Sequence, residues 1–142
     1  MVCPARIVCV GNRFVPGDDL GGRVHDLLAG RPLPDGIELV DGGLHGLDLL
    51  RVVEGARRAV FVDSIAGFGA PGAVVVLPRA EVAALAEGAW GHHAGLPHLF
   101  HLLPRLCDGP PPEVILVGAE GPAGPAAVEA VAARAMAEAL RR

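Results

Sequence analysis

Five short apolar runs recur along the chain, separated by longer segments whose apolar residues follow a helical period. The runs are rich in aliphatic and β-branched residues, and most end at Gly or Asp. Such runs are typical of strands that are buried on both faces of a parallel sheet. We therefore predict one α/β domain over residues 1–142. It should be a three-layer sandwich with a mostly parallel, twisted five-stranded sheet and helices on both faces. The predicted strands are residues 5–12, 37–43, 58–64, 73–78 and 113–120.

Helical periodicity fills the segments between these runs. Asp18 or Asp19 is suited to capping the start of the first helix, and Gly30 to ending it. Only a loop separates the third run from the fourth, with no helix to form a crossover, so the fourth strand can be antiparallel. The predicted helices are residues 19–30, 44–57, 79–90, 98–107 and 124–142.

The composition excludes several functions. All twelve basic residues are Arg, so a phosphate-loop Lys and a Schiff-base Lys are both absent. A net charge of −4 disfavours a nucleic-acid partner. No apolar run is long enough to span a membrane, and the N-terminus lacks a signal-peptide pattern. With three cysteines and no zinc spacing, we expect a cytoplasmic protein in a reducing compartment, with no membrane partner.

Acidic residues stand at or just after the carboxyl ends of four predicted strands. Asp18 and Asp19 follow the first strand, Asp41 ends the second, Asp63 ends the third and Glu120 ends the fifth. In an open α/β sheet, ligands bind at this edge. Converging carboxylates repel one another and would repel a phosphate, whereas they attract a cation. The pattern therefore indicates a divalent-metal site.

Each acid also has a simpler explanation. Asp18 or Asp19 is explained as a helix cap, and Asp41 before two glycines as part of a turn. Asp63 is harder to explain in this way, because it follows the buried run "AVFV" and Asp is seldom buried without a partner. Taken together, the acids favour a site over four separate structural roles.

Two adjacent histidines, His92 and His93, lie in a glycine-flanked loop and are natural candidates to complete a metal site with Asp19 and Asp63. His98 and His101 sit among apolar residues and fit boundary positions better.

Two side chains are possible nucleophiles. Ser64, the only Ser, stays open as a nucleophile beside His92, although nothing visible activates it. Cys9 lies inside a predicted strand and is explained as a small buried apolar residue.

Five motifs, in the same order, resemble those of the hydrogenase maturation proteases, over roughly residues 6–122. They are "VGNRFVPGDDLGGRV", "VDGGLHGLDLL", "VFVDSIAGFGAPGAVVVL", "HHAGLPHLFHLL" and "PPEVILVGAEGP". This resemblance implies a small cytoplasmic endopeptidase. It would remove the C-terminal extension from the large-subunit precursor of a nickel–iron hydrogenase, after nickel insertion.

The resemblance also implies roles for single residues. Asp19, Asp63 and His92 would contact nickel, which the precursor supplies, although another divalent metal could replace it in vitro. The Asp-Gly-Gly motif at residues 41–43 is assigned to the substrate side. Asp41 is the candidate catalytic base, and Gly42, Gly43 and His93 are candidate substrate contacts. Asp18 is assigned to capping or to supporting Asp19.

Two alternatives remain at this point. One is a nickel-dependent checkpoint module that binds the precursor without cutting it; the protein itself is expected to be a monomer. The other is a metal-dependent hydrolase of a small substrate. The chain departs from the family pattern at Leu20 (Gly), Leu44 (Thr) and Glu120 (Gln), which bears on substrate identity more than on the fold.

Overall fold

The computed structural model describes residues 3–43, 49–84, 95–107, 109 and 111–142, with only the backbone described at Gly95 and His98. Five strands form one sheet in the order β2-β1-β3-β5-β4. All neighbours are parallel except β4, which runs antiparallel to β5. The strands are β1 (Ala5–Val10), β2 (Ile37–Gly43), β3 (Arg58–Ile65), β4 (Val74–Pro78) and β5 (Glu113–Glu120).

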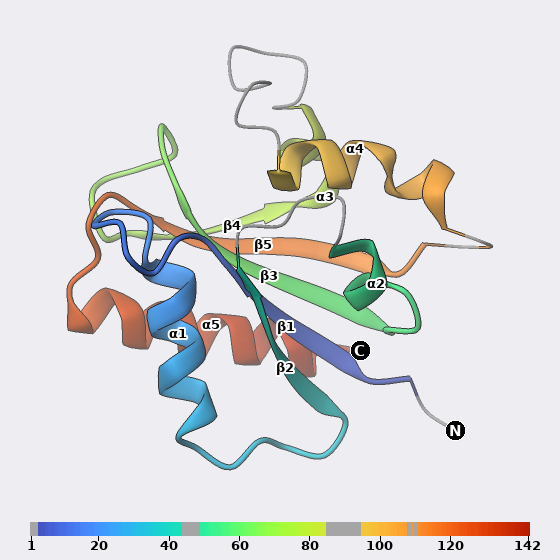
Figure 1. Cartoon of the computed structure of the whole chain (residues 1–142), viewed down its shortest axis with the longest axis horizontal. Helices are drawn as coiled ribbons and strands as arrows, with labels where there is room; N and C mark the ends of the chain where they lie inside the picture. Colours follow the sequence, from blue (N-terminus) through green and yellow to red (C-terminus); the bar gives the residue numbers. More distant parts are fainter. Residues whose placement is uncertain (1–2, 44–48, 85–94, 108, 110) are drawn as a thin grey trace.

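Helices cover both faces of this sheet (Figure 1). The helices α1 and α5 pack on one face, where their aliphatic residues meet those of β1, β3 and β5. The helices α2, α3 and α4 pack on the other face. The described helices are α1 (Leu20–Ala29), α2 (Leu50–Val53), α3 (Arg79–Ala84), α4 (Gly95–Leu106) and α5 (Pro125–Leu140).

The predicted fold class is confirmed, including the antiparallel fourth strand. Gly30 ends α1 as expected, with its backbone N–H bonded to carbonyls of the last turn. The second helix is much shorter than predicted within the described residues, because α2 covers only Leu50–Val53. Gly55 follows it with φ +80°, a conformation that an L-residue adopts only at a cost, so the helix cannot continue.

Charged residues form a buried cluster at the amino edge of the sheet, where the parallel strands begin. Arg58, the first residue of β3, is 4% exposed, and Glu138 of α5 is 2% exposed. The Arg58 guanidinium donates to the Glu138 backbone carbonyl at 2.7 Å and to its carboxylate at 3.0 Å, and it also pairs with Glu113. A buried charge is tolerated only when it is paired in this way. The cluster therefore ties α5 to the sheet.

In the described part of the chain, no helix is long and apolar enough to cross a membrane.

Candidate functional site

The candidate site lies at the carboxyl edge, the end of the sheet opposite the charged cluster. Two loops leave neighbouring strands at this edge, residues 11–19 after β1 and residues 66–73 after β3. Both loops gather at the left end of the molecule in Figure 1. Because β1 and β3 are parallel neighbours, their loops begin side by side.

Two carboxylates converge above Gly11. If Gly11 carried a Cβ, that atom would lie 3.3 Å from Asp63 Oδ1 and 3.5 Å from Asp18 Oδ1. It would also lie 2.6 Å from the Asp18 carbonyl oxygen, and φ at Gly11 is +122°. Only Gly fits this position, for reasons of both space and backbone conformation. We call Asp18 and Asp63 the acid pair.

The loop itself directs Asp18 inward. Backbone bonds from Val15 N–H to the Asn12 carbonyl (3.1 Å) and from Asp18 N–H to the Val15 carbonyl (3.0 Å) fold it into successive turns. Asp18 Oδ2 then accepts a bond from the Asn12 N–H at 3.1 Å. This bond supports the expectation that Asp18 stabilises the local backbone. Its position beside Asp63 was not expected.

Asp63 sits in surroundings that oppose its negative charge. Loss of solvent, and secondly the nearby Asp18 charge, raise the pKa of Asp63 to about 8, although the bond from the Ser64 N–H (2.8 Å) acts in the opposite direction. A cation bound beside the acid pair would relieve this repulsion and favour the charged form. The electrostatics of the acid pair therefore suit a positively charged ligand.

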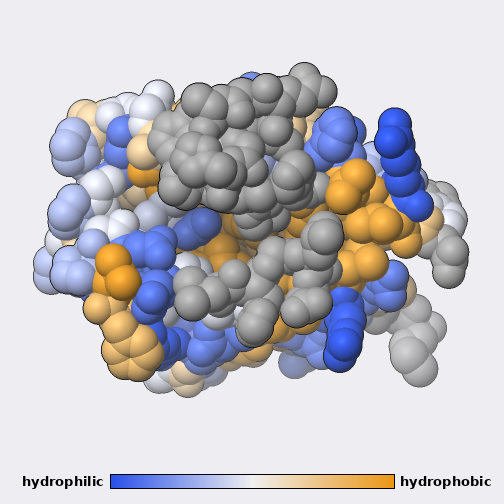
Figure 2. All heavy atoms as spheres, turned by 45° about the horizontal axis from the view of Figure 1, so that its top comes forward, coloured by the Kyte–Doolittle hydropathy of each residue, from blue (hydrophilic) through white to orange (hydrophobic). Residues whose placement is uncertain are grey.

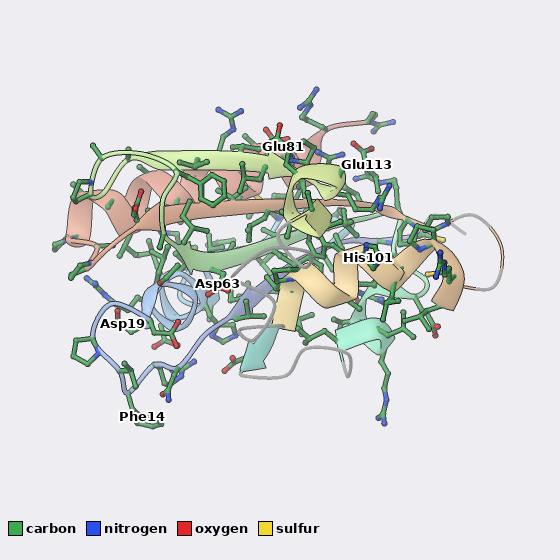
Figure 3. All side chains as sticks on the ribbon, turned by 90° about the horizontal axis from the view of Figure 1, so that it is seen from above. Phe14, Asp19, Asp63, Glu81, His101 and Glu113 are labelled. Atoms are coloured by element: carbon green, nitrogen blue, oxygen red, sulfur yellow. The ribbon has the colours of Figure 1, made fainter. Side chains whose placement is uncertain are left out.

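Asp19, the acid that the sequence analysis chose as a ligand, occupies the N-cap position of α1. Its side chain makes no capping hydrogen bond there. Figure 3 shows Asp19 where the loop meets the helix, and Asp63 further in, toward the sheet. No group of three His, Cys, Asp or Glu side chains within the described ranges is arranged to hold a metal ion. The predicted ligand His92 and the predicted contact His93 lie outside those ranges.

Asp41 forms an ion pair that the sequence alone did not predict. Arg13 donates from one nitrogen to the Asp41 carboxylate at 2.9 Å, and from the other to Asp26 of α1 at 3.2 Å. Arg13 thereby joins three elements, namely the 11–19 loop, α1 and β2. Arg13 holds the Asp41 carboxylate in place, so this geometry fits an orienting role better than proton abstraction.

The two glycines after Asp41 have packing roles. A Cβ at Gly42 would lie 2.8 Å from a methyl group of Val10 and 3.1 Å from one of Leu49. The Gly43 carbonyl accepts a bond from the Gly11 N–H at 2.8 Å, which ties the end of β2 to the start of the 11–19 loop. Substrate contact by these glycines stays a prediction.

Glu120, the last residue of β5, holds the second loop. Its carboxylate accepts bonds from the backbone N–H groups of Gly67, Phe68 (3.1 Å) and Gly69 (2.7 Å). These three donors hold the pKa of Glu120 below its usual range. The Glu120 carbonyl also accepts from the Gly72 N–H at 3.0 Å. The sequence predicted that Glu120 lies at the carboxyl edge of the sheet, but it did not predict that the Glu120 carboxylate binds the backbone of a loop.

The alternative nucleophiles have no activating group among the described residues. The buried Ser64 Oγ has no hydrogen-bond partner in that part of the chain. Cys9 is buried as expected, and burial, with a smaller effect of the Asp41 charge, raises the pKa of its thiol to about 12. A thiol with that pKa is not a nucleophile at neutral pH.

Comparison with known proteins assigns the chain to a family. The family model described as hydrogenase maturation protease matches residues 23–141. The chain belongs to the hydrogenase maturation protease family. It is 31% identical to the hydrogenase 2 maturation protease of Escherichia coli strain K12 over 115 residues, which cover 79% of this chain and 70% of that protein.

Solved structures of this family share the fold. The hydrogenase-maturating endopeptidase HybD from E. coli superimposes with a TM-score of 0.74 at 28% identity, covering 96% of this chain and 90% of that one. A hydrogenase 2 maturation peptidase from a Thaumarchaeota archaeon superimposes with a TM-score of 0.60 at 27% identity, covering 96% and 95%. Protease activity is therefore the activity of the family to which this chain belongs.

Proposed function

We propose that this protein removes the C-terminal extension from the large-subunit precursor of a nickel–iron hydrogenase, after nickel has been inserted. The observation that carries the proposal is the acid pair above Gly11, which favours a positively charged ligand. We infer that this ligand is the nickel of the precursor, which belongs to the substrate. The enzyme would act in the cytoplasm as a monomer.

We assign the first nickel contact to Asp18 rather than to Asp19, because the Asp18 carboxylate shares the space above Gly11 with Asp63. His92 remains the proposed third contact, since imidazole and carboxylate groups both suit nickel. These side chains would hold the precursor so that the peptide bond to be cut lies beside the metal. A nickel ion held there would supply Lewis-acid chemistry, by polarising the carbonyl of that bond or activating a water molecule.

Asp41 has a supporting role in this proposal. Its ion pair with Arg13 fixes the end of β2 against the 11–19 loop, on which Asp18 lies. Asp41 would therefore orient the site, rather than take a proton from the attacking water. The sequence suggested Asp41 as a catalytic base. In this proposal Asp41 instead acts through its ion pair with Arg13.

A parallel incubation with nickel-loaded and nickel-free precursor tests the proposal. Intact-mass spectrometry should show loss of the C-terminal extension from the nickel-loaded precursor alone. Equal cleavage of both forms would contradict nickel recognition. Binding of the loaded precursor without any loss of mass would instead support the checkpoint module, and no interaction with either form would contradict both functions.

A further inference from the structure

The four phenylalanines of the chain divide into two buried and two exposed residues. Phe61 and Phe100 are fully buried, and their rings meet edge to face with centroids 5.1 Å apart. Phe14 is 88% exposed and Phe68 is 36% exposed. Phe14 belongs to the 11–19 loop and Phe68 to the 66–73 loop, so both lie at the carboxyl edge, on the loops that begin beside the acid pair.

Side-chain oxygens fix the backbone of both exposed phenylalanines. The Phe14 N–H donates to Asn12 Oδ1 at 3.0 Å, and the Phe68 N–H donates to Glu120 Oε2 at 3.1 Å. The turns of the first loop and the other Glu120 bonds add to this order. An aromatic ring on an ordered loop loses little conformational entropy when it binds, and such rings often dominate the affinity of a protein interface.

The position of these rings indicates a polypeptide partner. Figure 3 shows Phe14 at the outer tip of its loop, beyond Asp19 and Asp63. A small molecule held by the acid pair would have no need of a ring so far out. A polypeptide that presents a metal to the acid pair lies across both loops instead. Figure 2 shows apolar atoms grouped among hydrophilic ones at the left end of the molecule, where both loops lie in Figure 1.

We propose that Phe14 and Phe68 are apolar anchors that grip the precursor on the two sides of the acid pair. This inference rests on the proposed function, because it takes the hydrogenase large-subunit precursor as the occupant. Apolar side chains of the precursor that flank its nickel site would pack against the two rings. The anchors supply affinity, and the acid pair supplies metal recognition.

The test compares Phe14→Ala, Phe68→Ala and the double variant with wild type. The probe is the nickel-loaded large-subunit precursor from the same organism, with steady-state cleavage and equilibrium binding measured separately. Each single variant should raise KM and Kd about tenfold while kcat stays within about twofold. Leu106→Ala and Leu140→Ala are matched controls, because both residues are exposed and apolar but lie away from the two loops. Circular dichroism and thermal melting of each variant check that the fold is kept.

The two measurements separate this inference from the proposed function. If wild type cleaves the precursor and the double variant has unchanged KM and Kd, the anchor role of Phe14 and Phe68 is overturned. The proposed protease function is then unaffected. If wild type binds the precursor without cleaving it, the proposed protease function is contradicted. The Kd values of the variants would then test, by themselves, whether Phe14 and Phe68 are anchors. Absence of both binding and cleavage by wild type would overturn the inference together with the function. An equal loss of affinity in the Leu106 or Leu140 controls would also overturn it.

Discussion

Asp18 and Asp63 place their carboxylates over the same glycine, although 45 positions separate them in the sequence. Asp18 arrives from the first loop and Asp63 from the end of β3. Loss of solvent raises the pKa of Asp63, and the Asp18 charge adds to that effect. The two side chains therefore act as one electrostatic unit, and changing either of them alters the environment of the other.

This relationship predicts a difference between two neighbouring acids. Asp18→Asn and Asp63→Asn should each lower kcat/KM for nickel-loaded precursor by about 100-fold or more, because each loses a charged metal contact. Asp19→Asn should stay within about threefold of wild type, since its side chain makes no cap bond. Cleavage assays on the three variants check this. The reverse order of effects would restore Asp19 as the ligand.

The pKa of Asp63 also predicts how stability depends on pH. The folded protein keeps a proton on Asp63 up to about pH 8, whereas the unfolded chain releases it near pH 4. Between these values the folded state binds more protons, so the free energy of unfolding falls as pH rises, by up to about 1.4 kcal/mol per unit. Asp63→Asn removes this contribution, so its advantage over wild type should grow from pH 5 to pH 8. Urea unfolding at four pH values measures it, with the exposed Asp35→Asn as control. A constant difference between Asp63→Asn and wild type would contradict the raised pKa.

The Arg13 ion pairs predict how Asp41 acts. Asp41→Asn should lower kcat about tenfold, because an amide oxygen still accepts a bond from Arg13. Arg13→Lys should have a similar effect, since one ammonium group cannot reproduce the two-nitrogen contact to Asp26 and Asp41. Stability should change little in both variants, because the ion pairs are exposed to solvent. A loss of kcat above about 1000-fold in Asp41→Asn alone would favour a catalytic base.

Gly21, inside α1, and Gly30, the residue that ends α1, should respond differently to the same change. A Cβ at Gly21 would lie 2.0 Å from the Val10 carbonyl oxygen, whereas a Cβ at Gly30 would meet nothing closer than 3.7 Å. Gly21→Ala should therefore destabilise the protein by about 2–4 kcal/mol or prevent folding, because backbone must move. Gly30→Ala should stay within about 1 kcal/mol of wild type. Thermal and urea unfolding compare them, and equal effects would show that α1 does not press against β1.

The Glu120 contacts predict local order in the second loop. Glu120→Gln replaces one acceptor oxygen with an NH₂ group, which cannot accept from a backbone N–H. The amides of residues 67–69 should then exchange with deuterium several times faster than in wild type, while the exchange of β5 stays unchanged. Glu129→Gln serves as the control, because Glu129 is an exposed residue that pairs with Arg31 rather than with a loop backbone. Unchanged protection at these amides would mean that other contacts hold the loop.

The sequence predicted the fold well, because the signals involved are local. Apolar runs and turn residues placed each strand within two residues, and the loop between the third and fourth runs allowed the antiparallel β4. The predicted range of the second helix was too long at its C-terminal end. A helical period alone does not show where tertiary packing begins or ends the helix. The break at Gly55 could have been used as a stop signal.

The site was predicted less completely, because its decisive contacts join distant segments. The sequence indicated that Asp63 lies near the end of β3, but adjacency in sequence cannot show whether the carboxylate of Asp18 or that of Asp19 lies beside it. That choice depends on the turns of the 11–19 loop and on the missing side chain at Gly11. The Arg13–Asp41 pair and the Glu120 bonds depend on loops whose paths have no sequence period. The predicted histidine contacts His92 and His93 lie outside the described residues.

The charged cluster at the amino edge has a consequence for how such a protein diverges. Arg58 begins β3 and Asp63 lies near its end. Among the described residues, the charged cluster and the acid pair therefore share no side-chain partner. Substitutions at distant sites without shared partners change stability additively. If the proposed function holds, residues of the 11–19 and 66–73 loops can change to fit a new precursor without compensating changes at the amino edge of the sheet.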